Sequence, residues 1–425
     1  ASLLAGLTAC SAGGDTGGKT QLLVWDAGLL TKSTDDGKVD TKKSFLHQAA
    51  ASFEKANPDV TVKIVQQTGD ISANSAQFQA ASIAGNGPDV RTGYTGGNTL
   101  SYSKFLLDLG GTFSDKTTKD LTGWNTVRAG YKSGGKLLAL PYGGGSYFYV
   151  FYNKKLATDA GLDLTKPPAT WEDLLALGAK AKAAGQNPFW LANQEGYVGA
   201  WVIAALVGGQ LGSEAFTKMY NAEIPVDDPA MVKAYAAYAK LYSSGLTNPD
   251  AGSVSNGDAV NGFVQGKGVF YISGGWDNAS IETALGDNAG AFAIPVLKGA
   301  KYPDTLAGGP NVAVSITSYS KHQALAKKFL NYLAEPSTID LYVKLNQTEA
   351  SNSASADTSV ITNALLRQQA DSVAKSKNVV FPFDNVMPQA LIDLFYKLNA
   401  TTLIGTTTPQ DAVDQLAAQF KRDGK

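Results

Sequence analysis

Histidine and cysteine are almost absent from this chain of 425 residues, which contains two histidines and one cysteine. His47 and His322 lie in polar, helix-like segments, where surface positions are the simplest interpretation. A histidine-based catalytic triad and a multi-histidine zinc site both need more histidines than this. The single Cys10 excludes an internal disulfide framework and a cysteine-rich metal site. We therefore expect neither a metal nor a cofactor.

Net charge is also nearly absent, because 36 Lys and Arg residues face 37 Asp and Glu residues. A net charge of −1 gives no general attraction to nucleic acid or to an anionic membrane. Hydrophobic residues make up 44% of the chain, as in a globular protein. A chain of this length exceeds what a single core fills, so the sequence predicts two domains or lobes.

Beyond the N-terminus, no run of about 18 apolar residues predicts a membrane-spanning helix. The chain starts with the apolar run ASLLAGLTAC and continues as a Gly, Ser and Thr-rich stretch. The segment LTAC resembles a bacterial lipobox, in which the cysteine is lipidated after signal-peptide cleavage. On this interpretation residues 1–9 are a signal-peptide remnant and 10–19 a flexible tether on lipidated Cys10. The alternative is an incidental cysteine in a frayed terminus.

The start of the globular part has an α/β pattern. Residues 21–26 (QLLVWD) and 60–66 predict strands, and 44–57 predict a helix with apolar residues at every fourth position. Strand, helix and strand in this order predict a parallel sheet with right-handed crossovers. Ligands of such sheets lie at the carboxyl ends of the strands. Tyr94 follows another predicted strand and is a candidate contact, unless it packs beneath the next loop.

The stretch GFVQGKGVFYISGGWDN (262–278) combines a buried strand, two glycines and a tryptophan. Glycines let the backbone approach a ligand closely. Trp276 offers a flat apolar plate and Asp277 a hydrogen-bond acceptor, which together suit a polar, ring-shaped ligand. Because tryptophan is usually buried, a core Trp276 is the alternative.

A second cluster of rings and polar groups occurs at FWLANQE (189–195). Trp190 can stack on the C–H face of a sugar, while Asn193 and Glu195 can pair with its hydroxyls. In the alternative, the ring belongs to the core and the polar residues form a surface turn.

Short motifs in this chain occur in the order found in extracellular solute-binding proteins of the carbohydrate ABC importers. The chain resembles this family over residues 21–421. The residues that carry the resemblance are Phe53, Glu54, Pro58 and Val62; Gly85, Pro88, Asp89 and Val90; Pro141, Tyr142, Tyr152, Asn153 and Lys154; and Phe263, Gly266, Lys267, Gly274 and Trp276. Gly268 and Val269 stand where the family more often has Ala-Met.

The resemblance implies an α/β, two-lobed periplasmic-binding-protein-like fold, with a ligand cleft between lobes joined by hinge strands. We expect residues 20–145 and 295–318 in the first lobe and 146–294 and 319–425 in the second. Three glycines at 143–145 can absorb the rotations of a hinge. The resemblance also implies cleft contacts at Ser146, Tyr147, Gly309, Phe383 and Asn385.

The expected function is therefore ligand capture for an ABC sugar importer, not catalysis. The partners would be an oligosaccharide, the permease subunits and, through Cys10, the lipid of the outer face of the cytoplasmic membrane; we expect a monomer that binds no nucleic acid. One alternative is a polyamine or peptide ligand. The other is a secreted glycoside hydrolase, with Glu195 and Asp277 as its paired carboxylates.

Overall fold

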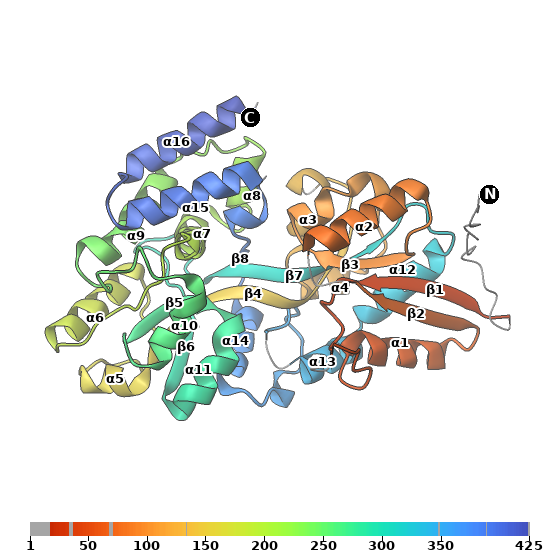
Figure 1. The fold of residues 1–425 in the computed structure, drawn as a ribbon, viewed down its shortest axis with the longest axis horizontal. Coiled ribbons are helices and arrows are strands. Elements are labelled where there is room, and N and C mark those ends of the chain that lie inside the picture. The colour runs from red at the N-terminus through yellow and green to blue at the C-terminus, as the bar shows by residue number, and fades with distance from the viewer. Residues whose placement is uncertain are drawn as a thin grey trace, which may run out of the picture.

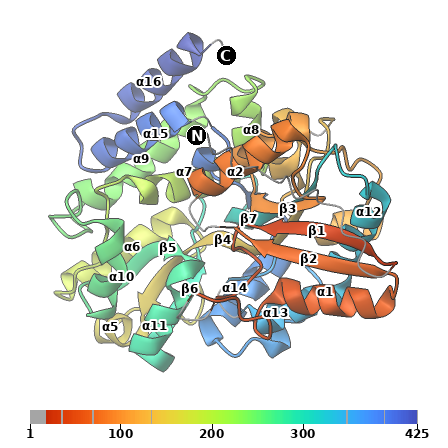
Figure 2. The same ribbon diagram turned by 45° about the vertical axis from the view of Figure 1, so that its right-hand side comes forward.

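The computed structural model describes residues 18–33, 37–67, 71–132, 134–346, 349–387 and 389–423. Two lobes lie side by side, joined by two long strands, β4 (Leu140–Asn153) and β7 (Thr305–Ile316) (Figure 1). A view turned by 45° shows a sheet with flanking helices in each lobe (Figure 2). The predicted α/β, two-lobed architecture is thus confirmed.

The first lobe is built on the predicted parallel strands. The strand order is β2-β1-β3-β7-β4, in which β1 pairs in parallel with β2 and β3, and β7 is antiparallel to β3. Helices cover both faces of this sheet (Figure 1). Its elements are β1 (Thr20–Asp26), α1 (Phe45–Ala56), β2 (Val60–Gln66), α2 (Ile71–Ala84), β3 (Val90–Tyr94), α3 (Gly97–Leu100), α4 (Asp115–Asp120), α12 (Gln323–Leu333) and α13 (Pro336–Leu345).

The second lobe is built on the far half of β4, which pairs antiparallel with β5 and β6. Its elements are α5 (Lys154–Asp159), α6 (Trp171–Ala183), α7 (Tyr197–Leu211), α8 (Ala215–Tyr220), α9 (Pro229–Ser243), α10 (Asn256–Val264), β5 (Phe270–Gly274), α11 (Asn278–Leu285), β6 (Ala289–Ala293), α14 (Ala364–Lys375), β8 (Asn378–Val380), α15 (Gln389–Leu403) and α16 (Pro409–Arg422). A capping box at Thr170 and Asp173 opens α6, and Trp171, the first residue of the helix, is fully buried.

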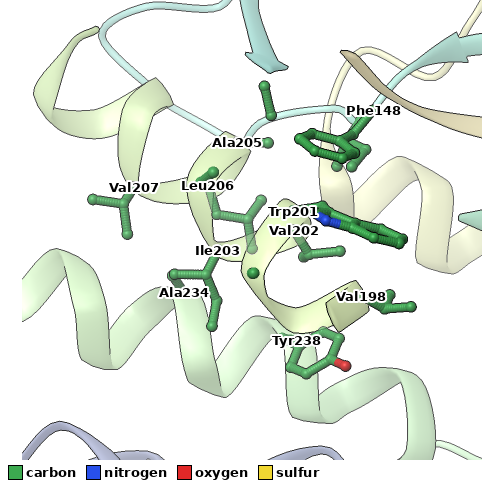
Figure 3. Packing of buried hydrophobic residues seen from close by; sticks show 14 of the residues in the cluster. Phe148, Val198, Trp201, Val202, Ile203, Ala205, Leu206, Val207, Ala234 and Tyr238 are labelled. Atoms are coloured by element: carbon green, nitrogen blue, oxygen red, sulfur yellow. The ribbon is translucent and has the colours of Figure 1, made fainter. Parts of the chain in front are cut away.

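Helix α7 forms the centre of this lobe. Its sequence contains no charged residue, so it can be buried on nearly every side, against α9, α15 and β7. Figure 3 shows its aliphatic side chains packed beside Ala234 and Tyr238 of α9, and its Trp201 next to Phe148 of β4.

The proposed hinge lies where β4 and β7 change partners. The register of β4 on β7 shifts between Tyr142 and Gly145, so Gly143 and Gly144 form a bulge, and Gly143 has a φ of 76°. A third connection runs alongside, because Gly145 donates its N–H to the carbonyl of Ala350. The bulge thus falls within the glycine run proposed as the hinge.

One segment lies in a different lobe from the one expected. Residues 319–345 were assigned to the second lobe, but α12 and α13 pack on α1 in the first. Phe329 of α12 meets Phe53 of α1 edge to face, with 5.1 Å between ring centroids. After β7 the chain therefore completes the first lobe before it crosses for the last time.

Candidate functional site

Trp276 is the one exposed aromatic ring in the described part of the chain, with 40% of its surface accessible. It lies in a short 3-10 helix, Gly275–Asp277, directly after β5. Two rings support it from below: Trp201, at 5.4 Å and 68°, and Phe148, at 5.8 Å and 76°. These two rings are themselves stacked, at 5.0 Å and 8°. The indole is thus packed against two rings while 40% of its surface stays accessible.

Gly274 is required for this arrangement. The indole of Trp276 folds back over the end of β5, where a Cβ on Gly274 would lie 2.1 Å from its Cζ3 atom. No side chain fits at that distance. The Gly-x-Trp spacing noted in the sequence therefore has a steric cause.

Asp277 points its carboxylate toward the protein. Its Oδ2 accepts hydrogen bonds from the hydroxyls of Tyr271, at 2.8 Å, and Ser273, at 2.6 Å. Burial raises the pKa of Asp277, and the two hydroxyl donors partly oppose this rise. Bound in this way, the carboxylate anchors the turn that carries Trp276.

On the first lobe, Asp26 organises the loop that follows β1. Its buried carboxylate accepts hydrogen bonds from the N–H groups of Gly28, Leu30 and Thr31 and from the hydroxyls of Thr31 and Thr92. One side chain thus satisfies a whole turn of backbone at the carboxyl end of the strand, which is where α/β sheets bind ligands.

A cavity of about 250 Å³ opens beside this loop. It lies between the end of β1, the start of α1, β7 and the end of α13. Its lining mixes polar and charged groups with a few rings: Gly28, Leu29, Leu30, Thr31, Lys32, Lys43, Phe45, Asn311, Val312, Tyr342, Leu345, Asn346 and Glu349. It also touches the hinge, because the Tyr342 hydroxyl accepts hydrogen bonds from the Gly144 N–H and from the Asn346 side chain.

Glu349 is the carboxylate of this cavity. Burial raises its pKa, and the positive charge of Lys32 partly offsets that effect. The half-buried Tyr94 also has a raised pKa, through burial first and then through the negative charge of Glu349. Electrostatic coupling therefore links Tyr94, a residue predicted from the sequence, to a carboxylate that was not.

Several other predicted site residues lie where the lobes join. Gly309 pairs with Ser146 in the β4–β7 ladder, and Tyr147, whose ring is buried, comes next in β4. The carbonyl of Asn385, in the 3-10 helix Phe383–Asn385, lies close to Gly96, 2.3 Å from where a Cβ would stand. These four residues are thus near the junction, although Tyr147 offers no exposed face.

The remaining predicted residues have structural partners inside the second lobe. Trp190 is buried and donates its indole N–H to the carbonyl of Ala259 at 2.9 Å. Asn193 is buried and accepts from the Tyr238 hydroxyl at 2.9 Å. Glu195 accepts a hydrogen bond from the backbone N–H of Asn256, at the start of α10. Phe383 is fully buried and stacks on Phe420.

Sequence reasoning missed the supporting rings and the whole cavity. The sequence does not mark Trp201 as a support of Trp276, because Trp201 and its partner Phe148 both lie far from Trp276 in the chain. Glu349 and Tyr342 lie close to the Ser/Ala-rich segment at 351–359, which gave no motif. No local signal marked either of them.

A family model, the bacterial extracellular solute-binding protein, matches residues 37–338. This match covers more than half of the chain. The chain belongs to this family. A relative, the sn-glycerol-3-phosphate-binding periplasmic protein UgpB of Salmonella paratyphi A, is 27% identical over 298 residues, which are 68% of this chain and 66% of that protein. The chain thus spans just under two thirds of that relative's length.

Two solved structures share the fold. A family 1 extracellular solute-binding protein from Bifidobacterium longum subsp. infantis has a TM-score of 0.75 at 20% identity, covering 96% of this chain and 100% of that one. A cyclic alpha-maltosyl-1,6-maltose binding protein from Arthrobacter globiformis has a TM-score of 0.74 at 19% identity, covering 95% and 98%. The family is one of binding proteins, in agreement with the expectation that the chain is not an enzyme.

Within the ranges that the structure describes, no helix is long and apolar enough to cross a membrane, and no group of His, Cys, Asp and Glu side chains could hold a metal ion. Cys10 and the proposed tether up to residue 17 lie outside these ranges.

Proposed function

We propose that the protein captures an oligosaccharide between its lobes and delivers it to the permease of an ABC importer. The observation that carries this proposal is the exposed indole of Trp276, held by Trp201 and Phe148 on the second lobe. A sugar ring has an apolar C–H face that stacks on such a plate.

The hydroxyls of the same sugar would pair with the polar groups of the first lobe. Asn311, Asn346 and Glu349 offer amide and carboxylate groups at the cavity, and Tyr94 lies near it. Ser146 and Gly309 in the hinge strands and Asn385 at the junction remain candidate contacts. A ligand that touches both lobes binds best when they are closed, so binding would shift the population toward the closed form.

The finer parts of the proposal rest on the sequence. Lipidation of Cys10 would anchor the protein to the outer face of the cytoplasmic membrane, with residues 11–19 as a tether. The closed form of a monomer would then be what the permease recognises.

Charged ligands are the alternative to a sugar, and the same experiment can compare them. Lys32 and Lys43 line the cavity and would attract an anion such as glycerol 3-phosphate, whereas Glu349 would repel it. Polyamines and peptides would favour the carboxylate and gain nothing from the two lysines.

The test is a thermal shift of residues 18–425 against mono- and oligosaccharides, glycerol 3-phosphate, polyamines and short peptides. A ligand at 100 times its dissociation constant adds about 2.7 kcal/mol of apparent stability. We expect a rise of several degrees with one class of oligosaccharide and none with the other compounds. A rise with glycerol 3-phosphate or a polyamine alone would contradict the sugar proposal, and cleavage of chromogenic glycosides would contradict binding without catalysis.

A further inference from the structure

A tyrosine of the first lobe is packed into the core of the second. Tyr131 ends a 3-10 helix, Ala129–Tyr131, at the tip of a hairpin whose base joins the first lobe through the Leu109 N–H and Leu137 carbonyl. Yet the ring of Tyr131 is 7% exposed and belongs to the apolar cluster around α7 and α8. It meets Tyr220 of α8 edge to face, at 5.2 Å and 81°.

The backbone on both sides of this contact is strained. Among the described residues, two that are not glycine have a positive φ: Tyr131, at 55°, and Ala222, at 57°. Left-handed backbone is unfavourable for residues with a Cβ, and it persists only where the surroundings enforce it. Both residues lie at the same junction between the lobes.

The strain at Ala222 has a defined origin. Helix α8 ends in a Schellman motif, in which the Ala222 N–H donates to the Met219 carbonyl and the Glu223 N–H to the Lys218 carbonyl. Glycine normally occupies the position of Ala222. The motif turns the chain so that Glu223 faces the hairpin of the first lobe, where its carboxylate lies 4.0 Å from the ammonium group of Lys132.

The polar part of this contact is weak. The Lys132–Glu223 pair is exposed on both sides, so solvent screens it and the buried ring supplies most of the attraction. A cavity of about 410 Å³ remains beside the ring, lined by residues of both lobes. Between the hairpin and α8, the buried part of the contact is therefore the ring of Tyr131, with a cavity and an exposed ion pair beside it.

We propose that Tyr131 is a latch that holds the two lobes together by inserting its ring beside Tyr220 of the second lobe. At β4 and β7 the chain itself joins the lobes, whereas this contact can open when the lobes separate. The latch would give the unliganded protein a population of closed molecules, so a bound solute has less to reorganise, and its apparent affinity rises with that closed fraction.

The test measures lobe separation without any ligand, so it does not depend on the proposed sugar. Spin labels are attached at Ile83→Cys on α2 and Lys240→Cys on α9, in a Cys10→Ser background. Pulsed electron paramagnetic resonance then reports the distance between the two lobes. Both positions are exposed and lie on different lobes. We expect a short-distance population in the otherwise unmodified protein, reduced about tenfold in Tyr131→Ala.

Two matched variants keep the test decisive. Tyr220→Ala removes the other half of the contact and should give the same loss, even if Tyr131→Ala does not fold. Tyr131→Phe keeps the ring and should retain the short distance. Unchanged distances in both alanine variants, or a protein that is entirely open before the substitutions, would overturn the latch.

Discussion

The two lobes contribute different kinds of surface to the proposed ligand site between them. On the second lobe, the site is one aromatic plate, Trp276. Gly274 and Asp277, which shape its turn, lie within two residues of it in the chain, and the rings of Trp201 and Phe148 pack against it. On the first lobe, the cavity has no such plate, and its walls come from the end of β1, the start of α1, β7 and the region after α13.

This difference assigns separate tasks to the two lobes. An aromatic plate binds a sugar ring through its C–H face, and this contact uses no directional hydrogen bond. A polar cavity discriminates, because a buried amide or carboxylate left without its partner is costly. We infer that the second lobe supplies general affinity and the first lobe selects the sugar.

The largest effect should come from a tryptophan outside the site. Trp190→Ala removes a buried ring and should lower the free energy of unfolding by about 3–5 kcal/mol, measured by urea denaturation. If Trp190 instead stacks on the ligand, Trp190→Phe would weaken sugar binding at unchanged stability. That result would show that Trp190 belongs to the site together with Trp276, and not to the core.

The second-largest effect should come from Asp26→Ala, which destabilises the loop after β1 in the first lobe. It leaves three backbone N–H groups and two hydroxyls without their acceptor, so we expect a loss of about 3 kcal/mol in stability. Asp26→Asn keeps the shape and one acceptor oxygen and should lose less. Equal stability of the wild type and both variants would show that this carboxylate does not organise the loop.

Trp276→Ala should weaken sugar binding about tenfold to a hundredfold, by calorimetric titration. The melting temperature of the free protein should fall less than for Trp190→Ala, because the Trp276 ring is packed on Trp201 and Phe148 but remains 40% exposed. Trp276→Phe is the control and should recover part of the affinity. Full affinity in the alanine variant would remove the aromatic half of the comparison.

Glu349→Gln should give the smallest change in the free energy of unfolding, and the size of this change should depend on pH. Because the pKa of Glu349 is raised above its ordinary value of 4.5, the unfolded chain ionises first as pH rises. The folded state then holds more protons, so the carboxyl group's contribution to stability is highest below pH 4.5 and falls as pH rises through the raised pKa.

At neutral pH Glu349→Gln should therefore raise stability by about 1 kcal/mol or less and flatten this pH dependence, measured as unfolding free energy across the acidic range. Asp59→Asn, at an exposed position, is the control. A variant as pH-dependent as the wild type would contradict a buried, ionised Glu349.

The sequence predicts best what depends on near neighbours in the chain. The β1–α1–β2 unit and the capping box of α6 follow from residues a few positions apart. The exposure of Trp276 also depends on Trp201 and Phe148, which are distant in the chain. Trp190, a ring in an equally polar stretch, differs only in its distant partners, such as Ala259 and Gly262, which local patterns do not reveal. Glu349 gains its role from Lys32 and Tyr342, which come from other segments. The lobe of α12 and α13 likewise depends on contacts with α1.

The most direct test of the central claim is amide hydrogen exchange with and without the oligosaccharide selected by the thermal-shift panel. If one ligand is held between an aromatic and a polar side, it should protect residues 27–32 and 342–350 of the first lobe together with 274–278 of the second. Protection confined to one lobe at saturating ligand would contradict the account.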